Sequence, residues 1–229
     1  MADFFNGFLG TGMFEMYVEA IYLTLKITII STLISYILGI PLGILLYGTS
    51  SVGIFPNKYV NAVVGFIVNI LRSIPFMILL VMTMPLAKAV VGSKIGNNAF
   101  IFYLVIAATP FVARMVESSF LEIDAGVIEA AHSMGTNNLQ LIFKVIIPES
   151  KPSLLIGSAI AITTILGYTP MSQLVSGGGL GQLAIQYGLY RFNSQAMYIS
   201  SILLIILVQI MQEVLNRLAK RCDKRIRSK

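Results

Sequence analysis

Charged side chains are scarce in this chain of 229 residues. Asp, Glu, Lys and Arg make up 11% of it, whereas a soluble domain carries about a quarter. Hydrophobic residues make up 56%, and the mean hydropathy is +0.84. A soluble fold of this size has too little interior to bury so much apolar surface, and disorder needs the opposite composition. The composition therefore predicts an integral membrane protein.

Groups that carry protons or perform chemistry are nearly missing from the apolar stretches. No Asp or Glu occurs between Glu19 and Glu117, or between Glu149 and Glu213, and the single histidine is His132. Proton-coupled carriers usually place such groups within the membrane, and enzymes need a nucleophile with a base, or a metal cluster. We therefore expect no catalytic residue, no metal site and no enzymatic activity in this chain.

Two further absences exclude other classes of site. Cys222 is the only cysteine, so no disulfide can form within the chain. The glycine-rich run at 177–181 lacks the Gly-Lys-Ser/Thr sequence of a phosphate-binding loop. We expect this chain to bind no cofactor, so energy for uphill transport would come from another subunit.

The uncharged stretches predict an all-α protein with five transmembrane helices in a single domain, residues 1–229. A helix needs about 20 mostly apolar residues to cross the hydrocarbon layer. Such stretches lie at about 17–47, 60–86, 97–117, 152–170 and 192–216. In the first of them, Gly39, Pro41 and Gly43 predict a bend.

The basic residues predict how these spans are oriented. A cytoplasmic anchor is indicated by seven Lys and Arg after the last span: Arg217, Lys220, Arg221, Lys224, Arg225, Arg227 and Lys229. This tail is either simply solvated or bound to anionic lipid, and its position argues against nucleic acid as a partner. Placing it inside leaves eleven Lys and Arg in the cytoplasm and three, Lys88, Lys94 and Arg191, outside. Five spans then put the N-terminus outside.

A polar loop at about 121–149 interrupts the apolar stretches on the cytoplasmic side. Asp124 is placed to cap a helix, and Gly135 to supply a turn before a second short helix capped by Thr136 or Asn137. We expect Pro148 to end that second helix. One apolar stripe on the first helix is predicted by the spacing of Val127, Ile128, Ala131 and Met134. The stripe is either a docking surface for a partner or packing against the loop's own helix ends.

The same loop carries a long motif. Glu129-Ala130-Ala131 is followed by Gly135 and, after nine intervening residues, by Val145-Ile146-Ile147-Pro148. This pattern resembles the EAA loop of ABC importer permeases, with two conservative departures at Val145 and Ile147. The resemblance implies coupling helices that dock on separate ATPase subunits, which use ATP and Mg. It also implies five coupling residues: Glu129, Ala130, Ala131, Gly135 and Pro148.

A narrower resemblance covers nearly the whole chain. It rests on residues 69–76 (Asn-Ile-Leu-Arg-Ser-Ile-Pro-Phe), 108–117, 177–182 and 186–188, which look like the methionine-uptake permeases. This resemblance implies a type I importer fold, a homodimer, two ATP-binding subunits, and a solute-binding lipoprotein outside the bacterial cell membrane. Five helices are also too few to enclose a gated path alone, whereas a symmetric pair supplies ten.

The substrate implied is methionine or a related amino acid. Two alternatives remain open at this point. The same architecture would also suit another small substrate, such as a cysteine derivative or a methionine-containing dipeptide. A protein of another class, a membrane scaffold or sensor that docks an ATPase without transport, would also carry the loop.

The resemblance places the outer gate near the end of the fourth span. The matching residues are Tyr168, Thr169, Pro170 and Met171, of which Pro170 departs from the small residue more usual there. Met171 is either a gate residue or a side chain that packs against lipid or the core. Arg72 is the only charge deep in a span, and it is either a substrate contact on the path or a scaffold residue that pairs with carbonyls freed at Pro75. We expect an outer hinge at four glycines: Gly177, Gly178, Gly179 and Gly181.

Overall fold

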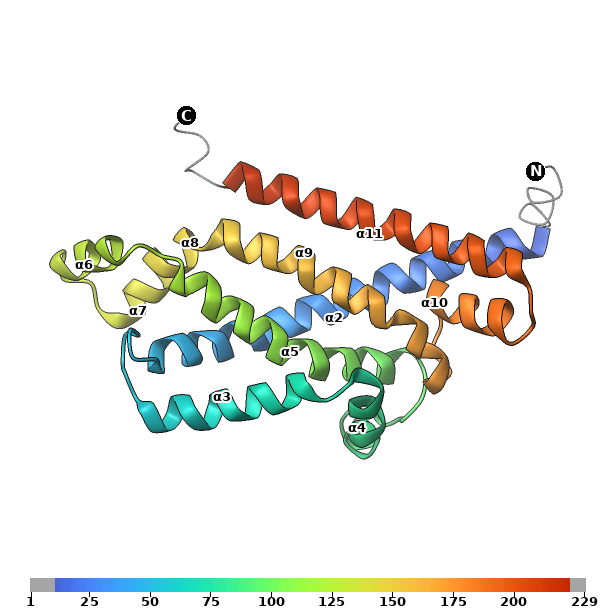
Figure 1. Cartoon of the computed structure of the whole chain (residues 1–229), viewed down its shortest axis with the longest axis horizontal. Coiled ribbons are helices and arrows are strands. Elements are labelled where there is room, and N and C mark those ends of the chain that lie inside the picture. Colours follow the sequence, from blue (N-terminus) through green and yellow to red (C-terminus); the bar gives the residue numbers. More distant parts are fainter. Residues whose placement is uncertain (1–10, 223–229) are drawn as a thin grey trace. The chain divides into compact units, whose positions relative to one another are not determined.

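A computed structural model describes residues 11–222, and side chains from residue 13 onward. In this range the regular structure is entirely helical (Figure 1). The elements are α2 (Thr11–Thr49), α3 (Lys58–Ser73), α4 (Phe76–Val91), α5 (Asn97–Leu121), α6 (Ala125–Ser133), α7 (Asn138–Gln140), the π-helix η1 (Leu141–Ile146), α8 (Ile147–Glu149), α9 (Lys151–Tyr168), the 3-10 helix η2 (Thr169–Val175), α10 (Leu180–Leu183), the π-helix η3 (Ala184–Leu189) and α11 (Ser194–Cys222).

Four of the helical stretches are long and apolar enough to cross a membrane: α2, α5, α9 with η2, and α11. A fifth span exists if the broken pair α3 and α4 counts as one. The interval predicted at 60–86 therefore contains two helices rather than one. Two of the long helices extend beyond the predicted spans. Helix α5 continues past residue 117 to Leu121, and α11 continues past residue 216 to Cys222. The N-terminus and most of the basic tail lie outside the described residues.

The break between α3 and α4 follows from Pro75. Ile74, which precedes it, takes an extended conformation with ψ 125, as a residue before proline prefers. Pro75 lacks the N–H that would continue α3, yet its carbonyl accepts from the amides of Ile78 and Leu79 and so begins α4. A single proline thus ends one helix and starts the next.

Helix α2 continues through Pro41 without interruption, and its glycines have a packing role. A Cβ at Gly39 would lie 2.6 Å from Cγ1 of Val112, and one at Gly43 would lie 2.5 Å from Cβ of Val116. The two glycines, four residues apart, let α2 approach α5 closely, as small residues do between membrane helices.

Contacts divide the described chain into two compact units. The first unit contains residues 11–34, 75–107 and 162–211, and the second contains 35–74, 108–161 and 212–222. The four long helices contribute one part to each unit. Buried residues of the first unit cluster around Tyr17 and Leu180. Those of the second unit cluster around Val116, Phe120 and Leu141.

Many large apolar side chains are exposed along the long helices. In α3 and α11 they include Tyr59, Val63, Phe66, Ile67, Ile70, Tyr198, Ile202, Ile205, Ile206, Ile210 and Val214. An exposed apolar surface of this extent avoids water when it contacts lipid tails or another protein chain.

Candidate functional site

The loop between α5 and α9 forms a helix, a tight turn and a second helix, as the sequence predicts. Asp124 caps α6 because its side chain accepts from the amide of Gly126 at 2.8 Å. At the other end Gly135 takes φ +76, a left-handed conformation that costs glycine nothing. The Thr136 hydroxyl donates to the carbonyl of Ala131 at 2.8 Å and holds the turn against the helix.

The second short helix is capped by Asn137. Its side chain accepts from the Gln140 amide at 2.8 Å, while the Gln140 side chain accepts from the Asn137 amide at 3.2 Å. Pro148 lies at the end of this helical stretch, as expected. The elements α7, η1 and α8 follow one another without a gap, and the stretch ends at Glu149, one residue after Pro148, with the break before α9 at Ser150.

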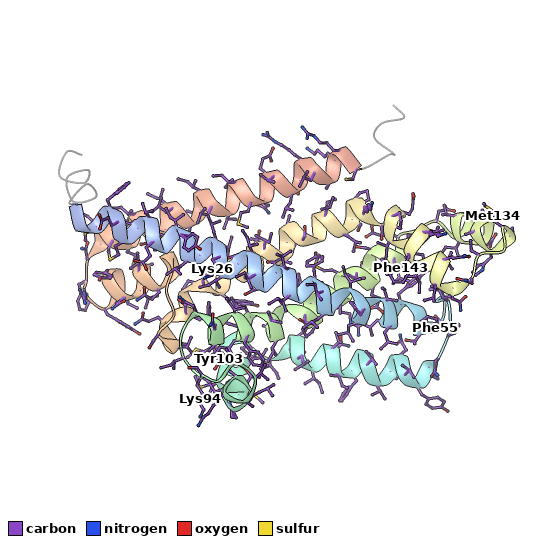
Figure 2. All side chains as sticks on the ribbon, turned by 180° about the vertical axis from the view of Figure 1, so that it is seen from behind. Lys26, Phe55, Lys94, Tyr103, Met134 and Phe143 are labelled. Carbon is purple, nitrogen blue, oxygen red and sulfur yellow. The ribbon has the colours of Figure 1, made fainter. Side chains whose placement is uncertain are left out.

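The predicted apolar stripe of α6 is divided between two directions. Ala131 is buried and Ile128 packs beside it in the core of the second unit, with Val116 and Phe120. Met134 is 84% exposed, and Figure 2 shows it projecting at the tip of the loop. Packing against the loop's own core is therefore confirmed for Ile128 and Ala131, whereas docking of a partner on the exposed part of the stripe stays a prediction.

The five predicted coupling residues lie in one loop without sharing one face. Glu129 and Ala130 are exposed on α6, whereas Ala131 is buried. Gly135 forms the turn, and Pro148 is exposed at the far end of the loop. Sequence reasoning did not single out Leu139 and Phe143, which are 67% and 62% exposed on the same loop. The spacing that predicts the apolar stripe of α6 does not include Leu139 and Phe143, because both follow the turn at Gly135.

The predicted gate residues lie where α9 changes into a 3-10 helix. Tyr168 ends α9, and its ring stacks on Phe76 with centroids 4.4 Å apart. Pro170 is one of the first residues of η2, and Met171, partly buried, follows it. Pro170 has no amide to donate to the carbonyl of Leu166, four residues earlier, and the hydroxyl of Thr169 donates to that carbonyl instead at 2.7 Å.

The glycine run is held by two distant side chains within the first unit. Asn97 accepts from the amide of Gly178 at 2.7 Å, and Thr24 accepts from the amide of Leu180 at 2.9 Å. A Cβ at Gly179 would lie 2.8 Å from the Thr24 hydroxyl, and one at Gly181 2.5 Å from the Pro170 nitrogen. These glycines allow close packing here, and their proposed hinge motion remains a prediction.

Arg72 lies in the last turn of α3, and its side chain is exposed. Its recorded contact within residues 11–222 is the ring of Phe111, whose centroid lies 6.0 Å from the guanidinium carbon. The described residues record no hydrogen bond from Arg72 to the carbonyls near Pro75. The arrangement leaves the guanidinium donors available.

A basic residue that sequence reasoning counted only as a cytoplasmic charge has a structural role. Arg114 forms an ion pair with Glu117 at 2.7 Å and donates to the carbonyl of Gly65 at 3.1 Å, so it ties α5 to α3. A Cβ at Gly65 would lie 3.1 Å from the guanidinium. The spacing of Arg114 and Glu117, three residues apart on one helix, is the signal that could have revealed the pair.

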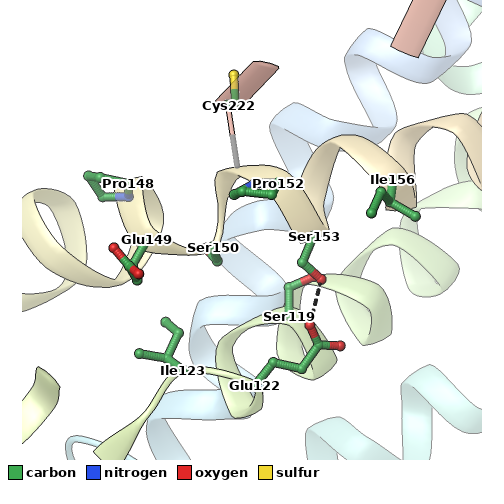
Figure 3. A pocket seen from close by; sticks show the side chains of 10 residues that line it. All are labelled: Ser119, Glu122, Ile123, Pro148, Glu149, Ser150, Pro152, Ser153, Ile156 and Cys222. Atoms are coloured by element: carbon green, nitrogen blue, oxygen red, sulfur yellow. Dashed lines mark hydrogen bonds between the residues drawn. The ribbon is translucent and has the colours of Figure 1, made fainter. Parts of the chain in front are cut away.

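A cavity of about 310 Å³ lies where the loop leaves α5 and returns to α9, within the second unit (Figure 3). Its lining includes Ser119 in the last turn of α5, Glu122 just after that helix, Glu149 at the end of α8, Ser153 in the first turn of α9 and Cys222 at the end of α11. The Ser153 hydroxyl donates to Glu122 at 3.0 Å and lies 2.9 Å from that of Ser119. Within the described chain no group of three His, Cys, Asp or Glu is arranged to hold a metal ion.

Comparison with known proteins gives one matching family. Residues 39–228 match the profile described as "Binding-protein-dependent transport system inner membrane component". The chain is 42% identical over 211 residues to a probable D-methionine transport system permease protein of Vibrio cholerae, covering 92% of this chain and 94% of that one. It is 40% identical over 181 residues to the methionine import system permease protein of Bacillus subtilis, covering 79% and 82%.

Solved structures agree with these relatives. A permease chain from inward-facing conformations of the MetNI methionine ABC transporter matches with a TM-score of 0.91 and 39% identity, covering 94% of this chain and all of that one. An amino acid ABC transporter solved with histidines matches with a TM-score of 0.74 at 19% identity, covering 93% and 98%. The second match bears on the fold alone.

Proposed function

We propose that this chain carries methionine across the inner membrane of the cell. The premise is that it belongs to the family of binding-protein-dependent transport system inner membrane components. It is the membrane-spanning permease of an ABC importer, with a type I importer fold. We propose methionine as the substrate because three similar proteins are named as methionine transporters. They are the relatives from Vibrio cholerae and Bacillus subtilis and the MetNI transporter. Similarity over nearly the full chain carries this proposal.

The transport unit that we propose is a homodimer. The described spans of one copy number four, or five with the broken pair, too few to enclose a gated path. Exposed apolar side chains on α3, such as Val63, Phe66 and Ile67, supply surface that a second copy or lipid would cover. A two-fold pair would place equivalent helices around a central axis.

Energy would enter through the loop between α5 and α9. We propose that two ATP-binding subunits, using ATP and Mg, dock on the exposed residues of α6 and α7, among them Glu129, Ala130 and Met134. Ala131, buried in the core with Val116 and Phe120, would pass their motion to α5. The basic tail would share the cytoplasmic side with the loop, and a solute-binding lipoprotein would deliver the substrate on the other, where the N-terminus lies.

Two side chains are proposed to line the path itself. Met171 follows the change of helix type after α9, and its unbranched side chain can seal a narrow opening and still yield. Arg72 keeps its guanidinium donors available beside Phe111, so it would meet the carboxylate of a passing amino acid.

The experiment is uptake by proteoliposomes that contain the chain, its ATPase and its binding protein. We expect ATP-dependent accumulation of radiolabelled methionine and ATP hydrolysis that rises with the loaded binding protein. Unlabelled methionine should compete, whereas a cysteine derivative and a methionine-containing dipeptide should compete less. If the cysteine derivative or the dipeptide inhibited uptake more strongly than unlabelled methionine, that compound would be assigned as the substrate instead. An ATPase that docks but neither responds to substrate nor drives uptake would identify a scaffold or sensor.

A further inference from the structure

The turn that joins η3 to α11 exposes a cluster of large apolar side chains (Figure 1). Leu189, Tyr190 and Phe192 are all exposed, Phe192 most of all. Phe192 also takes φ +53, a left-handed conformation that a bulky residue rarely adopts. Glycine or asparagine would adopt it at lower cost, so the strain points to a contact of this ring outside the chain. Residues 189–192 are called the aromatic turn below.

The aromatic turn is held by the residues on either side of it. The Asn193 amide donates to the carbonyl of Tyr187 at 3.1 Å, and the Asn193 side chain accepts from the amide of Ala196 at 3.1 Å in the first turn of α11. Gly188 lies against α11, because a Cβ there would be 2.6 Å from that of Met197. The exposed rings are therefore presented by a turn with a defined conformation.

The position of the aromatic turn along the chain places it at a membrane surface. Helix α11 is apolar enough to cross a membrane, and little of its most apolar stretch is buried within the chain. A crossing takes about 20 residues, and the ion pair of Glu213 with Arg217 marks the polar end of this one. Counting back about 20 residues from Glu213 reaches Asn193, directly after the aromatic turn.

The chemistry of the aromatic turn matches the boundary between lipid tails and headgroups. Tyr190 combines an apolar ring with a hydroxyl, a combination enriched at this boundary, and Phe192 adds a second ring. Arg191 is exposed, and its guanidinium carbon lies 4.5 Å from the centroid of the Tyr187 ring. Within residues 11–222 no ion pair is recorded for Arg191, so its charge is available to a lipid phosphate. Tyr198 continues the exposed apolar surface along α11.

We propose that the aromatic turn anchors α11 in the surface of the lipid bilayer, with the rings of Tyr190 and Phe192 at the upper end of the lipid tails and Arg191 on a headgroup phosphate. Continuity with the apolar surface of α11 that crosses the membrane favours lipid over the solute-binding protein as the occupant. The anchor sets the depth and tilt of α11. It has no part in docking the ATPase, whose loop is expected on the other side of the membrane, and it does not depend on the solute carried.

Tryptophan fluorescence tests the anchor, because the chain contains no tryptophan and one substitution gives an unambiguous signal. Phe192→Trp is made in the full-length chain, which is reconstituted in phosphatidylcholine vesicles that carry bromine, a quencher, at a chosen depth. We expect emission at a shorter wavelength than in water, and stronger quenching by bromine near the headgroups than by bromine near the tail ends. Tyr190→Trp should behave in the same way.

Two control variants calibrate the depth. Ile205→Trp lies within the crossing of α11, so bromine near the tail ends should quench it more strongly. Met134→Trp lies at the exposed tip of the loop between α5 and α9, so neither brominated lipid should quench it.

The contact of Arg191 with lipid phosphate has its own measurement. Brominated phosphatidylglycerol should quench Phe192→Trp more than the same proportion of brominated phosphatidylcholine, because one basic residue at the surface enriches anionic lipid about five-fold. Arg191→Gln should remove this difference and leave the depth of the tryptophan unchanged. Equal quenching by the two lipids in the presence of Arg191 would contradict the phosphate contact.

Two results would overturn the anchor itself. The first is a Phe192→Trp signal that brominated lipid does not quench and that matches the emission of Met134→Trp. The second is a photo-reactive benzoylphenylalanine at position 192 that links to the solute-binding protein, or to a second copy of the chain, and not to lipid. The fluorescence requires neither transport nor an ATPase, so its outcome is separate from that of the uptake experiment. Tyr190→Trp keeps the test valid even where Phe192→Trp fails to fold.

Discussion

Met171 is the side chain that we propose as the seal of the path. It follows Pro170 in the short 3-10 helix that continues α9, beside Tyr168, whose ring is fixed against Phe76. The aromatic stack gives this segment a rigid side, and the thioether gives it a soft one.

Replacing Met171 with alanine should uncouple the transporter. We expect ATP hydrolysis without substrate to rise, because a seal weakened by about 1 kcal/mol changes the ratio of open to closed states about five-fold. Hydrolysis and uptake measured together in proteoliposomes check this. Met211→Ala, in the mostly exposed helix α11, is the matched control. Unchanged coupling in Met171→Ala would remove this residue from the gate.

For single residues, the sequence alone predicts local roles such as helix capping better than contacts with residues far along the chain. The capping roles of Asp124 and Asn137 follow from local chemistry, and the structure confirms both. The contacts of Arg114 with Gly65 and of Thr24 with Leu180 could not be predicted, because the partners lie 49 and 156 residues away.

The close approach of α2 and α5 depends on two glycines. Gly39 and Gly43 lie under Val112 and Val116, where no side chain fits. The sequence pattern suggested a bend at this point, because glycine and proline weaken a helix wherever they occur. Only the neighbouring helix reveals that the glycines are there for packing.

We expect Gly43→Ala to lower the stability of the second unit. Its Cβ would lie 2.5 Å from Val116 and 2.7 Å from the carbonyl oxygen of Ala113, and overpacking of this kind costs about 1–3 kcal/mol. Thermal unfolding in detergent measures the change. Gly167→Ala is the control, because nothing lies within 4 Å of its Cβ and alanine favours a helix. An equal or higher unfolding temperature for Gly43→Ala would contradict the packing role.

The helices could be predicted because a long apolar segment in lipid must satisfy its backbone hydrogen bonds internally, and a helix does so. Their interruptions were less predictable. The break at Pro75 and the continuation through Pro41 come from the same residue type, and tertiary packing decides between them. The division of the α6 stripe has the same cause, since Ile128 and Ala131 turn inward toward Phe120, which lies in another helix.

For the whole molecule, the exposed apolar residues of the loop are expected to hold the ATPase. Met134→Asp combined with Leu139→Asp places two charges on that surface, so the ATPase should no longer co-purify with the chain. Phe192→Asp is the matched control: Phe192 is 89% exposed, and its φ of 53 is one that Asp tolerates. Co-purification that survives the double substitution would remove these residues from the contact.

The bond between Thr24 and Leu180 has a consequence for the way the chain is made. A ribosome delivers Thr24 early, and Leu180 emerges 156 residues later. During most of synthesis the segment of α2 around Thr24 therefore lies in the membrane without the Leu180 amide, and the Thr24 hydroxyl has only its bond to the carbonyl of Ala20. Insertion of the first helix and its final packing are separate events, and a chain stopped before residue 180 holds its first span without the segment that secures it.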